Sequence, residues 1–333
     1  MRCLKEWPVK AVPAAVLLAV PLVWGNNYIL GVMVTVAIFA VAAAGLSVLM
    51  NLAGQVSFGH AAFMGLGGYA AAVLAVNYGW PPLLALAAAP LLPALAAGLV
   101  GRPVLKLREF YLVLATLAFG TLVHLLFNEC RAVTGGPSGL SGIPALKVFG
   151  FVLSSEREFY CLTWGVALAV LAACRNLRRS PVGRALSAVH ESEEAADACG
   201  IDTASLKLKT FVFSAALAGL AGGLYAFYIS FVSPSPFGFH ASVQLVLMAV
   251  LGGSAAWGPV AGAAAVIFLS EFLRWAAPLV LPGAGAECQI VVYGTALVII
   301  TIWKNSGVWG RVLCRLPAGK GGKEYAAGSA RPL

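Results

Sequence analysis

Charged residues are scarce in this sequence: Asp, Glu, Lys and Arg make up 11% of its 333 residues, whereas hydrophobic residues make up 60%. The mean hydropathy is +0.89. A chain this apolar does not stay dissolved in water, and its apolar runs of about 20 residues match the thickness of a bilayer. Because the runs are continuous rather than alternating, they predict helices and exclude a β-barrel. The predicted fold class is all-α, a polytopic helical membrane protein.

Patterns for catalysis and metal binding are also missing. The seven cysteines form no C-x-x-C pair, so the sequence predicts neither a disulfide framework nor a metal site. No G-x-x-x-x-G-K-[ST] motif occurs, because the Gly-Lys pairs of the tail lack its spacing. We therefore expect no enzyme activity and no cofactor in this chain. Any process that consumes ATP would therefore need another chain to bind the ATP and its Mg²⁺.

The apolar runs predict about ten transmembrane helices, with eight as the lower bound. They form one transmembrane domain over residues 11–303, preceded by an N-terminus at 1–10 and followed by a basic tail at 304–333, which we expect to be disordered. The predicted spans are residues 11–24, 28–50, 51–76, 81–101, 110–128, 159–174, 211–232, 243–251, 259–273 and 289–303.

The distribution of basic residues predicts the orientation. With both termini cytoplasmic, 18 of the 22 Lys and Arg residues fall inside, as the positive-inside rule requires. The other four lie in the predicted outer loop, residues 129–158, and at Arg274. The net charge of +9 then reflects membrane orientation, and we expect no nucleic acid partner.

One charged segment, residues 175–209, interrupts the apolar pattern with six Lys/Arg and five Asp/Glu. Ser180 followed by Pro181 predicts a helix start, Ser192 predicts a second start, and Gly200 predicts the end of that second helix. Two turns of helix are too short to be stable alone in water, so we expect the second helix to rest on a partner surface. The alternative is a solvated loop helix.

A polar stretch at residues 51–63 reads NLAGQVSFGHAAF. Unpaired polar groups are costly at membrane depth, and glycines here permit a broken or re-entrant helix near residues 51–60, such as transporters use to line a path. A second break is expected near 252–258. The candidate path residues are Gln55, Ser57 and His60. The alternative is an ordinary cytoplasmic turn. Elsewhere, Ala215, Gly219 and Gly223 predict close helix packing.

The spacing within the charged segment has a known likeness. Glu194-Ala195-Ala196, followed after three residues by Gly200, resembles the EAA-x-x-x-G loop of ABC importer permeases, which forms a coupling helix in a cleft of the ATPase subunit. NLAGQVSFGHAAF, LREFYLVLATLAFG, TGGPSGLSGIP and LMAVLGGSAAWGPVAGA also occur in order. Together these stretches resemble the branched-chain amino acid ABC transporter permease family, of the LivM type, over about residues 25 to 305. One departure is that no I-x-L-P follows Gly200.

The resemblance implies a permease subunit in a bacterial inner membrane that carries a branched-chain amino acid by alternating access. Its implied partners are a second permease subunit of the LivH type, two ABC ATPase subunits, a periplasmic or extracellular substrate-binding protein and the lipid bilayer. The implied ATPase-coupling residues are Glu193, Glu194, Ala195, Ala196 and Gly200. Thr134, Gly135 and Gly136 would help to receive the binding protein, or would belong to a packed glycine-rich loop.

Three alternatives stay open. Permeases for urea or short-chain amides resemble the same family. A stand-alone secondary carrier would work without any ATPase, but acidic residues are absent from the middle of the spans between residues 28 and 277, and proton-coupled pumps usually need one. A structural scaffold would show no transport defect on deletion.

Overall fold

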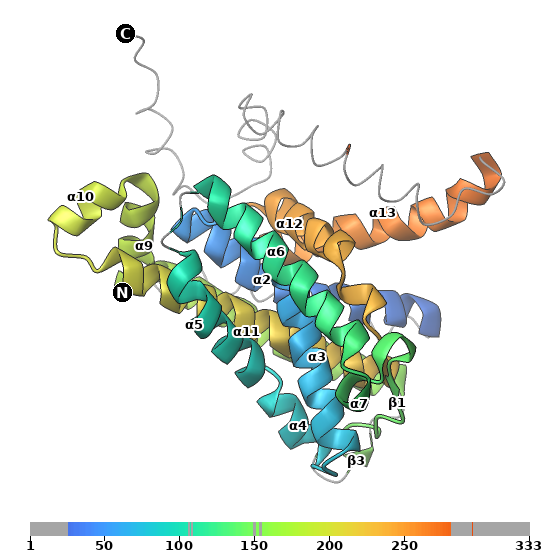
Figure 1. The fold of residues 1–333 in the computed structure, drawn as a ribbon. Helices are drawn as coiled ribbons and strands as arrows, with labels where there is room; N and C mark the ends of the chain where they lie inside the picture. The colour runs from blue at the N-terminus through green and yellow to red at the C-terminus, as the bar shows by residue number, and fades with distance from the viewer. Residues whose placement is uncertain are drawn as a thin grey trace. The chain divides into compact units, whose positions relative to one another are not determined.

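The computed structural model describes residues 26–105, 107, 109–148, 151–152, 155–280 and 295 (Figure 1). The chain divides into two compact units, residues 1–284 and 285–333, and all described residues except Thr295 belong to the first. The N-terminus, the predicted spans 11–24 and 289–303 (apart from Thr295) and the predicted tail lie outside the described residues.

Helices dominate the first unit. Their bounds are α2 Asn27–Ala53, α3 His60–Val76, α4 Pro82–Ala88, α5 Leu91–Val104, α6 Glu109–Glu129, α7 Arg131–Thr134, α8 Glu156–Arg179, α9 Pro181–Glu191, α10 Glu193–Ala198, α11 Thr203–Ile229, α12 Phe239–Gly252 and α13 Gly258–Val280. The described part of this unit also contains two 3₁₀ turns, η1 Gly136–Ser138 and η2 Ser235–Phe237, and four two-residue strands. The strands are β1 Leu140–Ser141, paired antiparallel with β4 Phe231–Val232, and β2 Lys147–Val148, paired antiparallel with β3 Phe151–Val152.

The helices confirm the predicted all-α membrane fold. Among the described residues, five helical segments are long and apolar enough to cross a bilayer: α2, α4 with α5, α6, α8 and α11. The shorter apolar helices there are α3, α12 and residues 258–272. Each of the eight predicted spans that fall in the described residues therefore coincides with an apolar helix or helix pair. The predicted breaks are also present, because residues 54–59 and 253–257 are not helical.

Helices α8 and α11 begin with charged turns that lie outside the spans predicted from hydropathy. Ser155 and Glu158 form a capping box that starts α8 at Glu156, and Asp202 accepts a hydrogen bond from the Ser205 N–H to start α11 at Thr203. Charged turns that hydropathy assigns to loops are therefore helical. The segment 175–209 contains the last turn of α8 and the first turns of α11.

The core is organised around α11, which packs along α3, α2 and α5. Small residues allow this contact, as they commonly do between membrane helices. A β-carbon on Gly222 would overlap the Met64 carbonyl oxygen of α3, and one on Gly223 would come 2.7 Å from the β-carbon of Ala89, beside α5. The predicted close packing is thus confirmed, and α3 and the α4–α5 pair are the partners of α11.

The two ends of α11 carry different structures. The helix has 27 residues and is therefore about 40 Å long. The segment formed by α9 and α10 contacts its N-terminal end, whereas β4 follows its C-terminal end and pairs with β1 (Figure 1). The charged segment and the glycine-rich loop accordingly lie at opposite ends of the membrane-spanning core.

Candidate functional site

The charged segment folds as two short helices that its own side chains cap. The hydroxyl of Ser180 accepts a hydrogen bond from the Gly183 N–H at 3.2 Å, and the hydroxyl of Ser192 accepts one from the Ala195 N–H at 3.2 Å. Gly200 has φ +82° and ends α10, where its N–H donates to the Asp197 carbonyl at 2.9 Å. These are the starts and the end that the sequence predicts.

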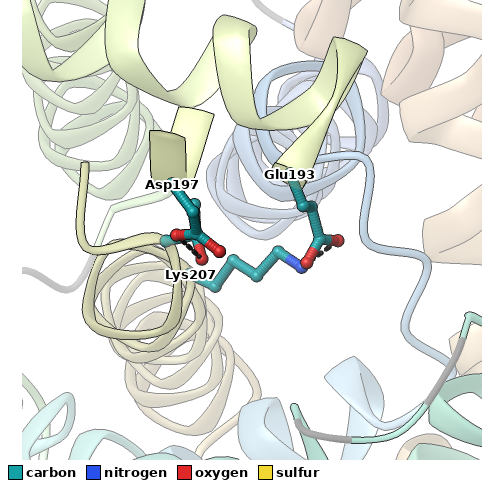
Figure 2. A network of polar contacts seen from close by, with 4 residues as sticks. Glu193, Asp197 and Lys207 are labelled. Atoms are coloured by element: carbon teal, nitrogen blue, oxygen red, sulfur yellow. Dashed lines mark hydrogen bonds and ion pairs between the residues drawn. The ribbon is translucent and has the colours of Figure 1, made fainter. Parts of the chain in front are cut away.

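The helix α10 is fastened to α11 by two side-chain contacts. Lys207 of α11 forms an ion pair with Glu193, and the Thr203 hydroxyl donates a hydrogen bond to Asp197 Oδ1 at 2.8 Å. Figure 2 shows Lys207 reaching across to Glu193, with Asp197 beside it. The expectation that a partner must support this helix needs correction, because the start of α11 already holds it.

The two faces of α10 differ in exposure. Ala196 is 3% exposed and packs inward. Glu194, Ala195, Cys199 and Gly200 are exposed. Of the implied coupling residues, Glu193 and Ala196 thus attach the helix to its own chain, and the other three are open to a visiting surface.

The neighbouring helix α9 packs the charged segment against the first break, residues 54–59. Leu186 is fully buried and Val189 is 2% exposed, and α9 packs on α2. Gly54, the residue that ends α2, has φ +67°, and a β-carbon there would overlap the His190 ring. The break at 54–59 therefore begins in contact with α9.

The break then runs into the core. His60, which starts α3, is fully buried, and Ser57 is 1% exposed. The His60 ring lies 3.0 Å from the Ser57 hydroxyl through Nδ1 and 2.7 Å from the Ser214 hydroxyl through Nε2. Ser214 is eleven residues into α11, about 16 Å along it. The non-helical stretch therefore runs from the end of α2 into the core and does not stay at one end of the helix bundle.

Hydroxyl groups from two other helices satisfy the backbone of the break. The Phe58 N–H donates to Thr116 Oγ1 of α6 at 3.2 Å, and the Ala61 N–H donates to Ser242 Oγ of α12 at 3.3 Å. The first N–H groups of a helix have no partner within it, so these contacts stabilise the start of α3 away from water.

A cavity of about 830 Å³ lies between the break and the charged segment. Its lining includes Gln55, Phe110, Val113, His190, Glu193 and Lys207. Gln55 is 5% exposed, and its Oε1 accepts no hydrogen bond from the part of the chain that the structure describes. Gln55 adjoins this cavity, whereas His60 is enclosed by the core.

The second break is tied to α2 and α8. The Gly253 carbonyl accepts hydrogen bonds from Asn51 Nδ2 at 3.2 Å and from the Ser47 hydroxyl at 3.2 Å. Arg178, in the last turn of α8, donates to the Ser47 hydroxyl at 3.0 Å and to the Ser254 carbonyl. One cluster therefore links α2, the end of α8 and the α12–α13 turn.

At the opposite end, the glycine-rich loop is tightly folded. The Thr134 hydroxyl donates to the Phe127 carbonyl at 2.7 Å and accepts from the Gly136 N–H at 3.1 Å. Thr134 and Gly136 are buried and Gly135 is half-buried, whereas Pro137 and Ser138 are exposed. This geometry favours the packed-loop alternative for the three candidate residues and leaves their neighbours open to contact.

Comparison with known proteins decides the family. The family described as the permease component of the branched-chain amino acid transport system matches residues 28–301. The chain belongs to this family. It is 32% identical over 295 residues to the high-affinity branched-chain amino acid transport system permease protein LivM of Escherichia coli (strain K12), covering 81% of this chain and 67% of that protein.

Other relatives agree. A probable LivM permease of Methanocaldococcus jannaschii is 31% identical over 44% of this chain and 42% of its own length. The permease LivH of Escherichia coli (strain K12) is 24% identical over 82% of this chain and 91% of its own length. No solved structure matches the chain. These similarities confirm the LivM-type resemblance that the sequence motifs indicate, for a membrane permease component.

Sequence reasoning missed the partners of the candidate residues. Ser214 belongs to no sequence motif, and only the folded structure shows its hydrogen bond with His60. Lys207 and Thr203 lie beyond the Gly200 turn, so no helical spacing relates them to α10. Arg178 is counted among the cytoplasmic cations, and only the folded second break shows its contacts. The sequence therefore carries no signal that relates these four residues to their contact partners.

Proposed function

We propose that this protein is the permease subunit of an ABC importer for branched-chain amino acids, driven by two separate ATPase subunits that dock on α9 and α10. The family supports permease function, and the names of the relatives support the substrate class. The observation that carries the coupling role is that α10 presents Glu194 and Ala195 outward while Glu193 is bound to α11.

The contacts of α10 define a route for movement. A force on its exposed face passes through the Glu193–Lys207 pair and the Asp197–Thr203 bond to the start of α11. Since α11 packs along α3, α2 and α5, tilting it displaces the helices around both breaks. Closure of the ATPase pair would thus alternate the access of the path.

The residues of the first break take different parts in this proposal. Gln55 lies beside the cavity, and its Oε1 has no hydrogen-bond donor among the described residues. We assign it as the contact with the path on the cytoplasmic side. Ser57 and His60 hold the shape of the break through Ser214. The substrate then leaves through the cavity between the first break and the charged segment.

The remaining partners follow from the same assignment. A second permease subunit of the LivH type shares the pore, and a substrate-binding protein docks at the opposite end, where Pro137 and Ser138 are exposed beside Thr134, Gly135 and Gly136. ATP and Mg²⁺ are bound by the ATPase subunits. The assembly lies in the bacterial inner membrane.

Reconstitution tests the proposal. Proteoliposomes containing this chain, the second permease and the ATPases are supplied with the binding protein and labelled leucine, isoleucine, valine or urea. We expect uptake of a branched-chain amino acid that requires both ATP and the binding protein. Uptake by this chain alone without ATP would establish a secondary carrier, and uptake of urea alone would establish the amide alternative.

A further inference from the structure

A small cavity at the end of α8 gathers three arginines. Arg175, Arg178 and Arg179 line it together with Ser254, and its volume is about 170 Å³. Arg178 and Arg179 lie three and four residues after Arg175, so both are neighbours of Arg175 on the helix surface. The cavity lies next to the α12–α13 turn, and no residue that the preceding sections assign to ATPase coupling or to the path lines it.

The positive charge in this cavity is not neutralised by the described part of the protein. Arg178 donates to two neutral oxygens, the Ser47 hydroxyl and the Ser254 carbonyl, and its buried Nε has no acceptor among the residues that the structure describes. Among the described residues the ion pair found is Lys207 with Glu193, and no carboxylate there pairs with the three arginines. Three guanidinium groups around one cavity repel each other, so an anion bound among them would stabilise the arrangement.

The chemistry of the lining selects the anion. Guanidinium groups bind phosphate through paired N–H donors, and the volume accommodates a single phosphate group. The other lining residues are apolar or weakly polar: Ala44, Leu171, Cys174, Ala256 and Pro259. The cavity lies at the cytoplasmic end of a spanning helix, the depth at which headgroups lie and at which basic pockets between helices bind anionic lipids.

We propose that Arg175, Arg178 and Arg179 form a binding site for the phosphodiester of an anionic phospholipid. Its phosphate contacts the three guanidinium groups, and its acyl chains extend along the apolar wall toward Leu171. The bound lipid joins the last turn of α8 to the α12–α13 turn, immediately before Ser180 begins the segment formed by α9 and α10.

Lipid titration of the full-length protein tests the site. The delipidated protein in detergent is titrated separately with short-chain phosphatidylglycerol, short-chain phosphatidylcholine and inorganic phosphate, and bound adducts are counted by native mass spectrometry alongside the melting temperature. We expect one saturable phosphatidylglycerol adduct that raises the melting temperature, with weaker binding of phosphatidylcholine. Equal binding of the two lipids would overturn the proposal, and saturation by inorganic phosphate at the same concentration would replace the lipid with a free anion.

Substitutions of the arginines test where the phosphatidylglycerol binds. Arg175→Gln and Arg179→Gln, singly and together, should weaken phosphatidylglycerol binding, by about tenfold or more in the double variant; Arg178 is kept because it holds the second break. The matched control is Arg102→Gln, since Arg102 is exposed in the last turn of α5 and lies outside the cavity. Weakening by Arg102→Gln equal to that of the double variant would show general surface attraction and reject the site. The wild-type lipid comparison stands even if a variant fails to fold.

Discussion

Lys207, one turn into α11, is paired with Glu193 at the start of α10, across the turn that Gly200 makes. The Lys207 side chain is 11% exposed and that of Glu193 is 57% exposed. A pair this open to solvent adds little to the free energy of unfolding, about 0–1 kcal/mol. Its consequence is geometric, because it fixes the exposed face of α10 relative to the helix at the centre of the core.

Reversing the charge of Glu193 tests whether the ion pair with Lys207 holds the exposed face of α10 in place. Glu193→Lys places two cations together and should reduce uptake per ATP hydrolysed several-fold, with little change in the melting temperature. The double variant Glu193→Lys/Lys207→Glu restores opposite charges and should recover part of the ratio. The measurement is ATP hydrolysis and amino acid uptake in the same proteoliposomes. A double variant no better than either single one would show that the pair does not transmit movement.

Substitutions at two adjacent alanines distinguish an effect on ATPase docking from an effect on folding. Ala196→Leu forces three extra carbons into a packed site and should destabilise the protein by about 1–3 kcal/mol, since Ala196 is 3% exposed. Ala195→Leu adds the same atoms to an exposed position and should leave the melting temperature unchanged while weakening ATPase binding. Pull-down of the ATPase subunits by the purified permease measures the second effect. Normal ATPase binding by Ala195→Leu would show that the ATPase subunits dock on another surface.

The sequence predicts local structure well here and tertiary partners poorly. Ser180, Ser192 and Gly200 act on backbone groups within a few residues, so their capping roles can be read from spacing. His60 bonds to Ser214 and Asn51 to the Gly253 carbonyl, contacts separated by more than 150 residues that no periodicity encodes. The spans predicted from hydropathy are also shorter than the helices α8 and α11, because hydropathy cannot distinguish a charged helical turn from a charged loop.

The buried contact between His60 and Ser214 predicts a stability effect. Ser214→Ala leaves His60 Nε2 without its partner in a fully buried site, which should cost about 1–3 kcal/mol. His60→Ala removes the ring and should cost at least as much. The double variant should be destabilised by less than the sum of the two. Thermal unfolding in detergent measures all three. Strict additivity would mean that the 2.7 Å contact contributes nothing.

Close helix contact predicts very different results for two glycines in the middle of helices. A β-carbon on Gly222 of α11 would overlap the Met64 carbonyl oxygen, whereas one on Gly98 of α5 would come no nearer than 3.9 Å, to Val212. Gly222→Ala should therefore separate α11 from α3 and lower the yield of folded protein sharply. Gly98→Ala should be neutral or stabilising by up to about 1 kcal/mol, because alanine favours helix. Size-exclusion profiles and melting temperatures report both. Similar behaviour of the two variants would contradict the packing of α11 on α3.

Gly200 and Gly142 allow backbone strain to be separated from coupling. Both are exposed glycines with positive φ, +82° and +80°, and a β-carbon on either meets no atom within 4 Å. Alanine at either position should therefore cost the same strain, about 1–2 kcal/mol.

Gly200 ends α10, however, and Gly142 lies in the loop at the other end of the core. Gly200→Ala, and more strongly Gly200→Pro, which also loses the N–H bond to the Asp197 carbonyl, should lower uptake per ATP hydrolysed. Gly142→Ala should leave that ratio unchanged at a similar melting temperature. If both alanine variants lowered the ratio equally, the loss would reflect strain alone, and α10 would not be the coupling helix.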